Sequence, residues 1–485
     1  MVVQHNMQAM NASRVLGITQ SAQAKSTEKL SSGYRINRAA DDAAGLSISE
    51  KMRKQIRGLD QASTNAQDGV SSVQTAEGAL TEVHSMLQRM NELAVQAANG
   101  TNSESDRSSI QDEIDQLTTE IDRVAETTKF NETYLLKGGN GDKTYHVHAH
   151  DAGLDGTLTE NTTKATFQMK ALNVGDSYAI GGTTYQIGAD TVTDALKTVT
   201  GDDNLTSTST SSTKVSNGDT ITIDGKSYTI VADGEQDTEQ AKITFGKIQS
   251  IANYGSTITY NGKSATVFSA KSGTTTLDQT DGVDNNNKTL ITADKAYKMV
   301  QQELKAASSI GAGNNDTKVD AAVKFEQGTG TDKVTYQNFT ITRGSVTTKN
   351  DLTFNLHVGA DADMTNKIGV TIEKMDSKNL GISGINVSDD SGKAATYAID
   401  AIADAVAKVS AQRSALGAVQ NRLEHTIANV DNVVENTNAA ESRIRDTDMA
   451  DEMVTYSKNN ILAQAGQAML AQANQSTQGV LSILG

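Results

Sequence analysis

The sequence predicts a mainly α fold, a long antiparallel helical bundle or coiled coil built from both chain ends, with a central β-rich (α+β) insertion of one or two small domains. Three observations predict this fold. Apolar residues recur every seven positions over Leu46–Ala98, a second apolar seam runs over Ile399–Val434, and the segment between them carries short alternating strands with Gly-containing turns. A seven-residue repeat kept this long is typical of a helix whose seam faces other helices.

The first long helix is expected over Leu46–Ala98 and would be about 80 Å long. Because that length exceeds one face of a compact domain, its seam must pack on a partner in the same chain or in another copy. Small residues fill many seam positions, which lets a neighbouring helix come close. We assign the larger seam residues to assembly: Met52, Leu59, Val73, Leu80 and Leu87.

Two further helices are expected around this one. Residues 1–33 form a weakly apolar helix that would be marginal alone, and Val3, Met7 and Met10 are its terminal-coil residues. A break at Asn99–Gly100 is followed by a candidate N-cap at Ser103 or Ser105, which starts the other helix. The short loop predicts an antiparallel hairpin with the long helix.

The C-terminal end matches the N-terminal end in character. The final segment, about 447–484, is rich in Ala and Gln like residues 1–33. Matching ends are expected to lie side by side, which places the termini at one end of an elongated molecule and the middle at the other. In the second seam we assign Ile402, Val409, Leu416, Leu423 and Val430 to assembly, and in the final segment Leu462, Met469, Val480 and Leu484 to the terminal coil.

The middle segment contains an internal repeat. Gly175–Ile187 and Gly218–Ile230 share the pattern G-D-x-x-x-I-x-G-x-x-Y-x-I, which predicts two short strands around a turn in each copy. A weaker third hairpin is expected near 256–267 and a helix over Thr292–Ala307. The run of eight hydroxyl residues at Thr206–Thr213 is interpreted as a loop.

Composition excludes several classes of protein. The net charge of −16 argues against nucleic acid and anionic membrane surfaces as partners. No apolar run approaches the ~20 residues of a spanning helix, so membrane insertion is not expected. The N-terminal residues lack the basic and apolar regions of an ordinary signal peptide. The chain has no Cys and no Pro, and the absence of Pro favours long helices and fast folding after delivery as a coil.

No catalytic constellation stands out, so neither an enzyme nor a cofactor is predicted. His146, His148 and His150 alternate along a candidate strand and are the candidates for binding Zn²⁺ or Ni²⁺. A solvated strand face is the favoured alternative, so no metal is predicted. "DQTDGVDNNN" lacks the ligand register of an EF-hand and is interpreted as a loop.

At both ends the sequence resembles bacterial flagellin, the subunit of the flagellar filament. The N-terminal motifs include "LSSGYRINRAADDAAGLSISEKMR", "NAQDGVSSVQTAEGAL" and "EIDRVAETTKFN", and the C-terminal motifs include "LGAVQNRLEHTIANV" and "ESRIRDTDMADEM". Together the resemblance covers about 1–140 and 350–485. It implies an extracellular structural subunit that is exported unfolded through the type III apparatus and polymerises into a helical filament for swimming.

The resemblance also implies a domain organisation. Residues 1–42 and 447–485 would form the terminal coiled-coil filament core, ordered only in the filament. Residues 43–140 and 350–446 would form a helical rod domain with a β-hairpin. Residues 141–349 would be a variable, outward-facing β-rich insertion. Two alternatives stay open from the sequence: a hook–filament junction-type flagellar protein and a surface adhesin.

Partners follow from the same resemblance. They are other copies of the chain, an export chaperone, the filament cap, hook–filament junction proteins and the host Toll-like receptor 5. The positions that match the receptor surface are Arg89, Leu93, Gln96 and Glu113. A salt bridge and ordinary packing are the plain structural interpretation of these residues. The C-terminal "VLSILG" resembles a tail read by cytosolic immune sensors but departs from it at Ile483 and Gly485.

Overall fold

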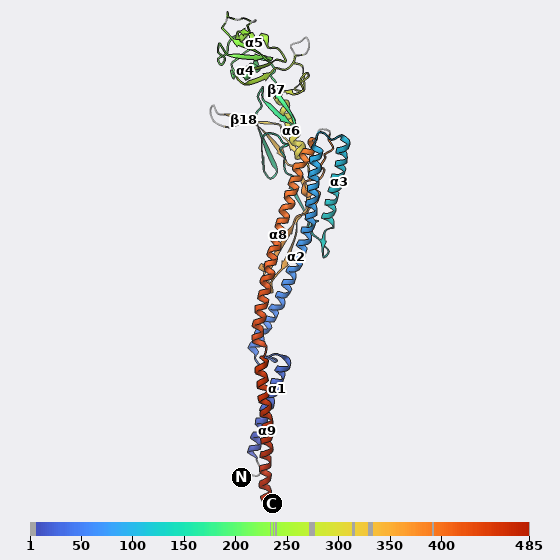
Figure 1. The fold of residues 1–485 in the computed structure, drawn as a ribbon, viewed down its shortest axis with the longest axis vertical. Helices are drawn as coiled ribbons and strands as arrows, with labels where there is room; N and C mark the ends of the chain where they lie inside the picture. The colour runs from blue at the N-terminus through green and yellow to red at the C-terminus, as the bar shows by residue number, and fades with distance from the viewer. Residues whose placement is uncertain are drawn as a thin grey trace. The chain divides into compact units, whose positions relative to one another are not determined.

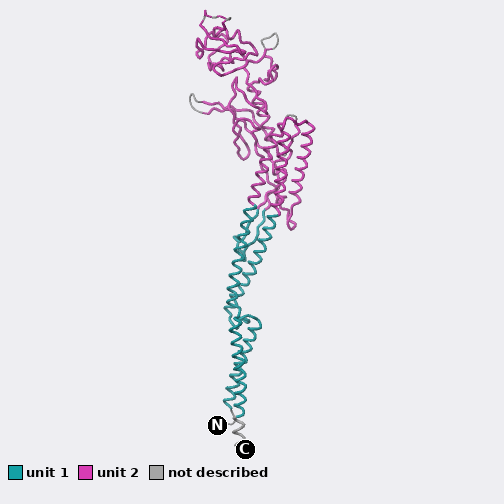
Figure 2. Tube along the Cα trace, viewed as in Figure 1, with its two compact units in different colours: residues 1–74, 353–370, 416–485 teal, residues 75–352, 371–415 magenta. Residues whose placement is uncertain are grey.

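The computed structural model describes residues 6–232, 234–235, 237, 240–270, 277–312, 316–327, 333–389 and 392–484, with side chains up to residue 475. The chain divides into two compact units (Figure 2). The first comprises residues 1–74, 353–370 and 416–485, and the second comprises 75–352 and 371–415. Two long helices, α2 (Ala43–Ala98) and α8 (Lys393–Arg445), contribute residues to both units.

In the first unit, α1 (Met7–Ser32) and α9 (Met449–Leu484) lie side by side and antiparallel (Figure 1). Asn6 Nδ2 donates to the Ala473 carbonyl at 3.0 Å, and Lys29 Nζ lies 3.5 Å from Glu452 Oε2. The two helices are therefore paired along their length, as the matching character of the chain ends predicts.

Short connections join α1 to α2 and α8 to α9, and they contact each other. The Arg35 amide donates to the Arg445 carbonyl at 2.6 Å, and the Thr447 amide donates to the Gly33 carbonyl at 3.0 Å. Gly33 ends α1 in the left-handed region, with φ of 75°, a conformation that Gly adopts without the steric cost of a Cβ.

The helices α2 and α8 are also antiparallel neighbours. In the first unit Ser63 Oγ donates to Asp431 Oδ1 at 2.9 Å, and in the second unit Arg413 Nη2 lies 3.5 Å from Glu77 Oε1. The hairpin strands β20 (Leu352–His357) and β21 (Lys367–Ile372) cover the pair in the first unit. A Cβ at Gly69 would lie 2.2 Å from Leu356 Cδ1, so the absence of a side chain at Gly69 makes room for Leu356.

The remaining helix of the predicted hairpin is α3 (Glu104–Thr127). The Ser103 side chain caps its N-terminus in a capping box with Asp106, as the sequence predicts. The same unit contains the short elements β1 (Lys129–Phe130), β2 (Thr133–Tyr134) and α7 (Ser377–Leu380).

The middle of the described chain contains one two-stranded ladder and three five-stranded sheets. The strands β3 (Asp142–His146) and β19 (Ser345–Lys349) form an antiparallel ladder. A sheet in the order β16-β18-β5-β4, with β17 also paired to β18, packs on α6 (Ala293–Ser308) around Phe167, Phe339 and Leu304. Its strands are β4 (Thr157–Glu160), β5 (Lys164–Lys170), β16 (Lys318–Val319), β17 (Val323–Gln327) and β18 (Val334–Thr342).

Two further five-stranded sheets contain the three predicted hairpins, and their orders are β13-β14-β15-β7-β6 and β10-β9-β8-β11-β12. The hairpin predictions are confirmed by β6 (Ser177–Ile180) with β7 (Thr183–Ile187), β8 (Thr220–Ile223) with β9 (Lys226–Ile230), and β11 (Thr257–Tyr260) with β12 (Lys263–Thr266). The other strands are β10 (Lys242–Ile243), β13 (Gln279–Thr280), β14 (Val283–Asp284) and β15 (Leu290–Ile291).

Three local features differ from or extend the sequence interpretation. The short helices α4 (Val192–Thr200) and α5 (Phe245–Ile251) were not predicted. "DQTDGVDNNN" forms the tight β13–β14 hairpin rather than a plain loop. The predicted loop at Thr206–Thr213 is present, and the hydroxyls of Ser212 and Thr213 donate to the Asp202 carboxylate at 2.8 and 2.9 Å. Among the described residues, no helix has the length and apolarity needed to cross a membrane.

Candidate assembly surface

The contact between α1 and α9 buries few side chains. The buried residues on the described parts of the two helices are Thr19 and Ser26 on α1 and Ala463 on α9. Gly466 lets α9 approach Leu16 closely, since a Cβ there would lie 3.3 Å from Leu16 Cδ1. The buried side chains of this interface are therefore small or polar, and the larger Leu16 is only half-buried there.

The large apolar residues assigned to the terminal coil lie elsewhere. Met7, Met10, Leu462 and Met469 are exposed and do not form the α1–α9 contact within one chain. Val3 lies outside the described residues, and so do the side chains of Val480 and Leu484. The assignment of these residues to the terminal coil of the filament stays a prediction, since the single chain leaves the described ones exposed.

Instead, the two helices present apolar surface to solvent. On α9, Val454 and Ile461 are seven residues apart, as are Leu462 and Met469, so each pair lies on one side of the helix two turns apart. A groove of about 520 Å³ runs over Met453, Val454, Ile461 and Leu462. Among the described side chains of the pair, the large apolar residues that are 48–72% exposed are Met7, Met10, Val15, Ile18, Met449, Met453, Val454, Ile461, Leu462 and Met469.

The seam residues assigned to assembly are buried inside the chain. The buried ones are Leu59, Val73, Leu80, Leu87, Ile402, Val409, Leu416, Leu423 and Val430, and Met52 is half-buried. The sequence left open whether this seam packs on the same chain or on another copy, and the structure shows the first. These residues form the core of the subunit and are not available as a surface for a neighbouring copy.

The residues matched to the receptor surface lie on α2 and α3 in the second unit. Arg89 Nε donates to Glu113 Oε1 at 2.8 Å, and Arg89 Nη1 donates to Glu92 Oε2 at 3.2 Å. The hydrogen bonds from Arg89 to these carboxylates, Glu113 first, raise the pKa of the Arg89 guanidinium above its ordinary value. Gln96 is also exposed, whereas Leu93 is only 2% exposed, so Leu93 supports this surface from beneath.

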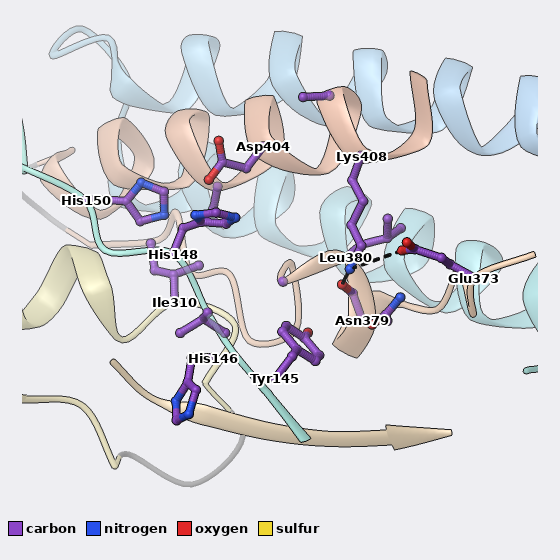
Figure 3. A pocket seen from close by; sticks show the side chains of 14 residues that line it. Tyr145, His146, His148, His150, Ile310, Glu373, Asn379, Leu380, Asp404 and Lys408 are labelled. Carbon is purple, nitrogen blue, oxygen red and sulfur yellow. Dashed lines mark hydrogen bonds and ion pairs between the residues drawn. The ribbon is translucent and has the colours of Figure 1, made fainter. Parts of the chain in front are cut away.

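The three histidines do not converge. His146 Nδ1 lies 3.3 Å from the Arg343 carbonyl, and His148 Nδ1 lies 3.0 Å from Glu160 Oε2. Figure 3 shows His146 apart from His148 and His150. Over the residues with described side chains, no group of three or more His, Cys, Asp or Glu residues could hold a metal ion.

His146, His148 and His150 all line one cavity of about 510 Å³ in the second unit, together with Lys408 (Figure 3). Lys408 Nζ donates to the Asn379 carbonyl at 2.6 Å and lies 4.9 Å from the centre of the Tyr145 ring. Burial lowers the pKa of Lys408, and the nearby Glu373 carboxylate, 4.0 Å away, opposes that effect. These polar contacts join β3, α7 and α8, so the polar residues of the cavity have a structural role in holding these elements together.

Comparison with known proteins finds matches at both helical ends of the chain. The family model of the bacterial flagellin N-terminal helical region matches residues 3–141, and that of the C-terminal helical region matches residues 399–484. A flagellin of Clostridium tyrobutyricum is 38% identical over 478 residues, covering 99% of this chain and all of that protein. Polar flagellin B/D of Vibrio parahaemolyticus is 34% identical, covering all of this chain and 99% of that protein.

Among solved structures, FliC from Burkholderia pseudomallei is 20% identical with a TM-score of 0.27, and the match covers 73% of this chain and 99% of that one. The full-length identity to curated flagellins does not favour the hook–filament junction alternative. The chain belongs to the bacterial flagellin family, and is therefore a structural subunit of the extracellular flagellar filament and not an enzyme.

Proposed function

We propose that copies of this chain polymerise through the apolar faces that α1 and α9 leave exposed. The observation that carries the proposal is the set of large apolar side chains on these helices, each about half exposed or more in the single chain. Soluble monomers rarely present contiguous apolar patches of this kind without a partner. Burying one such side chain contributes about 1.5–3 kcal/mol, so a few residues per copy suffice to favour the polymer.

The proposed domain roles follow the breaks between elements. Residues 1–42 and 447–485 act as the filament core, residues 43–140 and 350–446 as the rod domain, and residues 141–349 as an outward insertion. The start of α2 and the end of α8 support the first boundary, since each lies within a few residues of it. Before assembly the same apolar faces are suited to an export chaperone, and at the filament ends to cap and hook–filament junction proteins.

A substitution on α9 tests the proposal. Ile461→Lys places a charge in the exposed apolar groove, and Gln464→Lys adds the same charge at an exposed polar position of the same helix. We expect I461K to raise the critical concentration for seeded polymerisation at least about tenfold, the equivalent of about 1.4 kcal/mol, with an unchanged circular dichroism spectrum of the monomer.

The matched control separates apolar contact from charge. Q464K is expected to polymerise close to the parent protein. Normal filaments from I461K would contradict the assignment of this face, and an equal defect in both variants would show that added charge alone prevents assembly.

We further propose that the exposed patch of Arg89, Gln96 and Glu113 binds Toll-like receptor 5. The Arg89–Glu113 ion pair holds two long side chains in one geometry across α2 and α3, which lowers the entropy that binding must remove. The test is binding of the monomer to the soluble receptor ectodomain. R89A and E113A should each weaken binding about tenfold, while R123A, which removes an exposed cation from the same helix hairpin, should bind normally.

A further inference from the structure

One edge of β17 is unpaired among the strands that the structure describes. The strand pairs with β18 in an antiparallel ladder that sets Phe325 opposite Tyr336, and the sheet order places no described strand on its other side. All five residues of β17 are exposed. A free edge of this kind presents unpaired backbone N–H and C=O groups, which are a template for a further strand.

The two faces of β17 differ in chemistry. Val323 and Phe325 share one face and are 61% and 44% exposed. Exposed Val334 continues this apolar stripe on β18, because its register partner is Gln327, two residues beyond Phe325 on the same face. The other face carries Lys324 and Glu326, whose side chains lie 3.3 Å apart.

The order of residues in β17 is self-complementary. When two copies of β17 lie antiparallel with their Phe325 residues opposite each other, Lys324 of each copy lies opposite Glu326 of the other. The same contact then occurs twice, from Lys324 of the first copy to Glu326 of the second and from Lys324 of the second copy to Glu326 of the first. A two-fold symmetric interface requires this.

Neighbouring registers are disfavoured by the same residues. Sliding one strand by two residues sets Lys324 opposite Lys324, or Glu326 opposite Glu326, and like charges directly opposite destabilise a strand pair. Sliding it by one residue places the apolar stripes of the two hairpins on opposite faces of the joined sheet. The sequence of β17 therefore specifies a single antiparallel register with itself.

We propose that β17 is an interaction surface for a second copy of this chain. The two β17–β18 hairpins join edge to edge into one continuous sheet, with Phe325 against Phe325 on the two-fold axis and a Lys324–Glu326 pair on either side of it. This pairing is separate from polymerisation through α1 and α9, and it is tested on unpolymerised full-length protein.

Cysteine crosslinking reports the register directly, because the natural chain has no Cys. In the proposed pairing the two side chains at position 325 are opposite neighbours, whereas position 323 lies opposite position 327. We expect F325C to form crosslinked dimers with a short bis-maleimide at least about tenfold faster than K226C, an exposed strand position elsewhere, because pairing raises the effective concentration. V323C and Q327C should each crosslink poorly alone and well when mixed.

Charge exchange gives an independent test of the same register. In an F325C background, K324E alone sets Glu opposite Glu twice, and E326K alone sets Lys opposite Lys twice. Each variant should crosslink several-fold more slowly than F325C. An equal mixture of the two variants should recover the faster rate, because a dimer of one copy of each has a Glu–Lys pair at both positions across the interface. Crosslinking of F325C at the rate of K226C, or of V323C alone at the rate of the V323C–Q327C mixture, would overturn the proposal.

Discussion

At the scale of single residues, buried carboxylates organise the turns of the middle segment. Asp284 is fully buried and accepts hydrogen bonds from the backbone amides of Ser269 at 2.6 Å and of Asn286 and Asn287 at 2.8 Å. Burial of this carboxyl raises its pKa, but the hydrogen bonds from Ser269, Asn287 and Asn286 outweigh burial, and the net pKa lies below its ordinary value. These hydrogen bonds join the connection between β14 and β15 to Ser269, and they are stronger when Asp284 is charged.

Replacing this carboxylate tests its contribution. D284N should lower the free energy of unfolding of the second unit by about 2 kcal/mol at neutral pH, because an amide accepts fewer of these hydrogen bonds and carries no charge. Urea unfolding monitored by circular dichroism measures the difference. D281N at the exposed turn position of the same hairpin should change stability little, and equal losses in the two variants would contradict the role given to Asp284.

The stability difference between the parent protein and D284N should also depend on pH. Because the folded pKa of Asp284 lies below the unfolded value, its stabilisation is complete above the unfolded pKa and is lost as the pH falls through the folded pKa. The stability difference between the parent protein and D284N should therefore shrink as the pH is lowered from about 5 toward 3. A difference that stays constant over this range would show that the charge of Asp284 is not what stabilises the turn.

At the scale of elements, α1 and α9 are unlike α2 and α8. The contact of α1 with α9 buries Thr19, Ser26 and Ala463 among the described residues, whereas α2 and α8 bury a continuous apolar seam. An isolated helix pair gains most of its stability from apolar burial, so α1 and α9 open at low cost in the monomer. The order of the terminal segments only in the filament, which family resemblance implies, stays a prediction.

Hydrogen exchange measured by mass spectrometry should separate the two helix pairs. In the monomer, amides of α1 and α9 are expected to exchange far faster than those around Leu87 and Leu423, because local opening exposes little apolar surface. In the filament, α1 and α9 should gain protection while the inner seam changes little. Monomer protection of α1 equal to that of α2 would refute a marginal terminal pair.

The heptad pattern predicted the elements better than it predicted their partners. Periodicity identified α2, α3 and α8, and the N-cap of α3, because each depends on local spacing. It could not separate contact within the chain from contact between copies, since an apolar side chain such as Leu59 or Met469 looks the same in either setting. The short helices α4 and α5 were missed because they hold too few turns to show a period.

At the scale of the whole molecule, the middle segment is connected to the helical part of the second unit through two adjacent strands. His146 of β3 is the register partner of Ser345 of β19, and the Val147 amide donates to the Gly344 carbonyl at 3.0 Å. The two points of attachment are thus neighbours in one ladder, which the sequence alone could not show because they are almost two hundred residues apart. Only the change of composition near residues 141 and 350 indicated the boundary.

Because the two attachment points are neighbours, the middle segment can be deleted without separating β3 from β19. Replacing residues 148–343 by Asn-Gly should close the β3–β19 ladder with a two-residue hairpin turn. The variant loses the ion pair of Lys393 Nζ with Glu303 Oε1 at 2.9 Å and the cover over Tyr397, so thermal stability should fall modestly. Polymerisation should persist, since α1 and α9 are untouched. Seeded assembly followed by electron microscopy measures the outcome, and a folded monomer that fails to form filaments would show that the middle segment itself takes part in assembly.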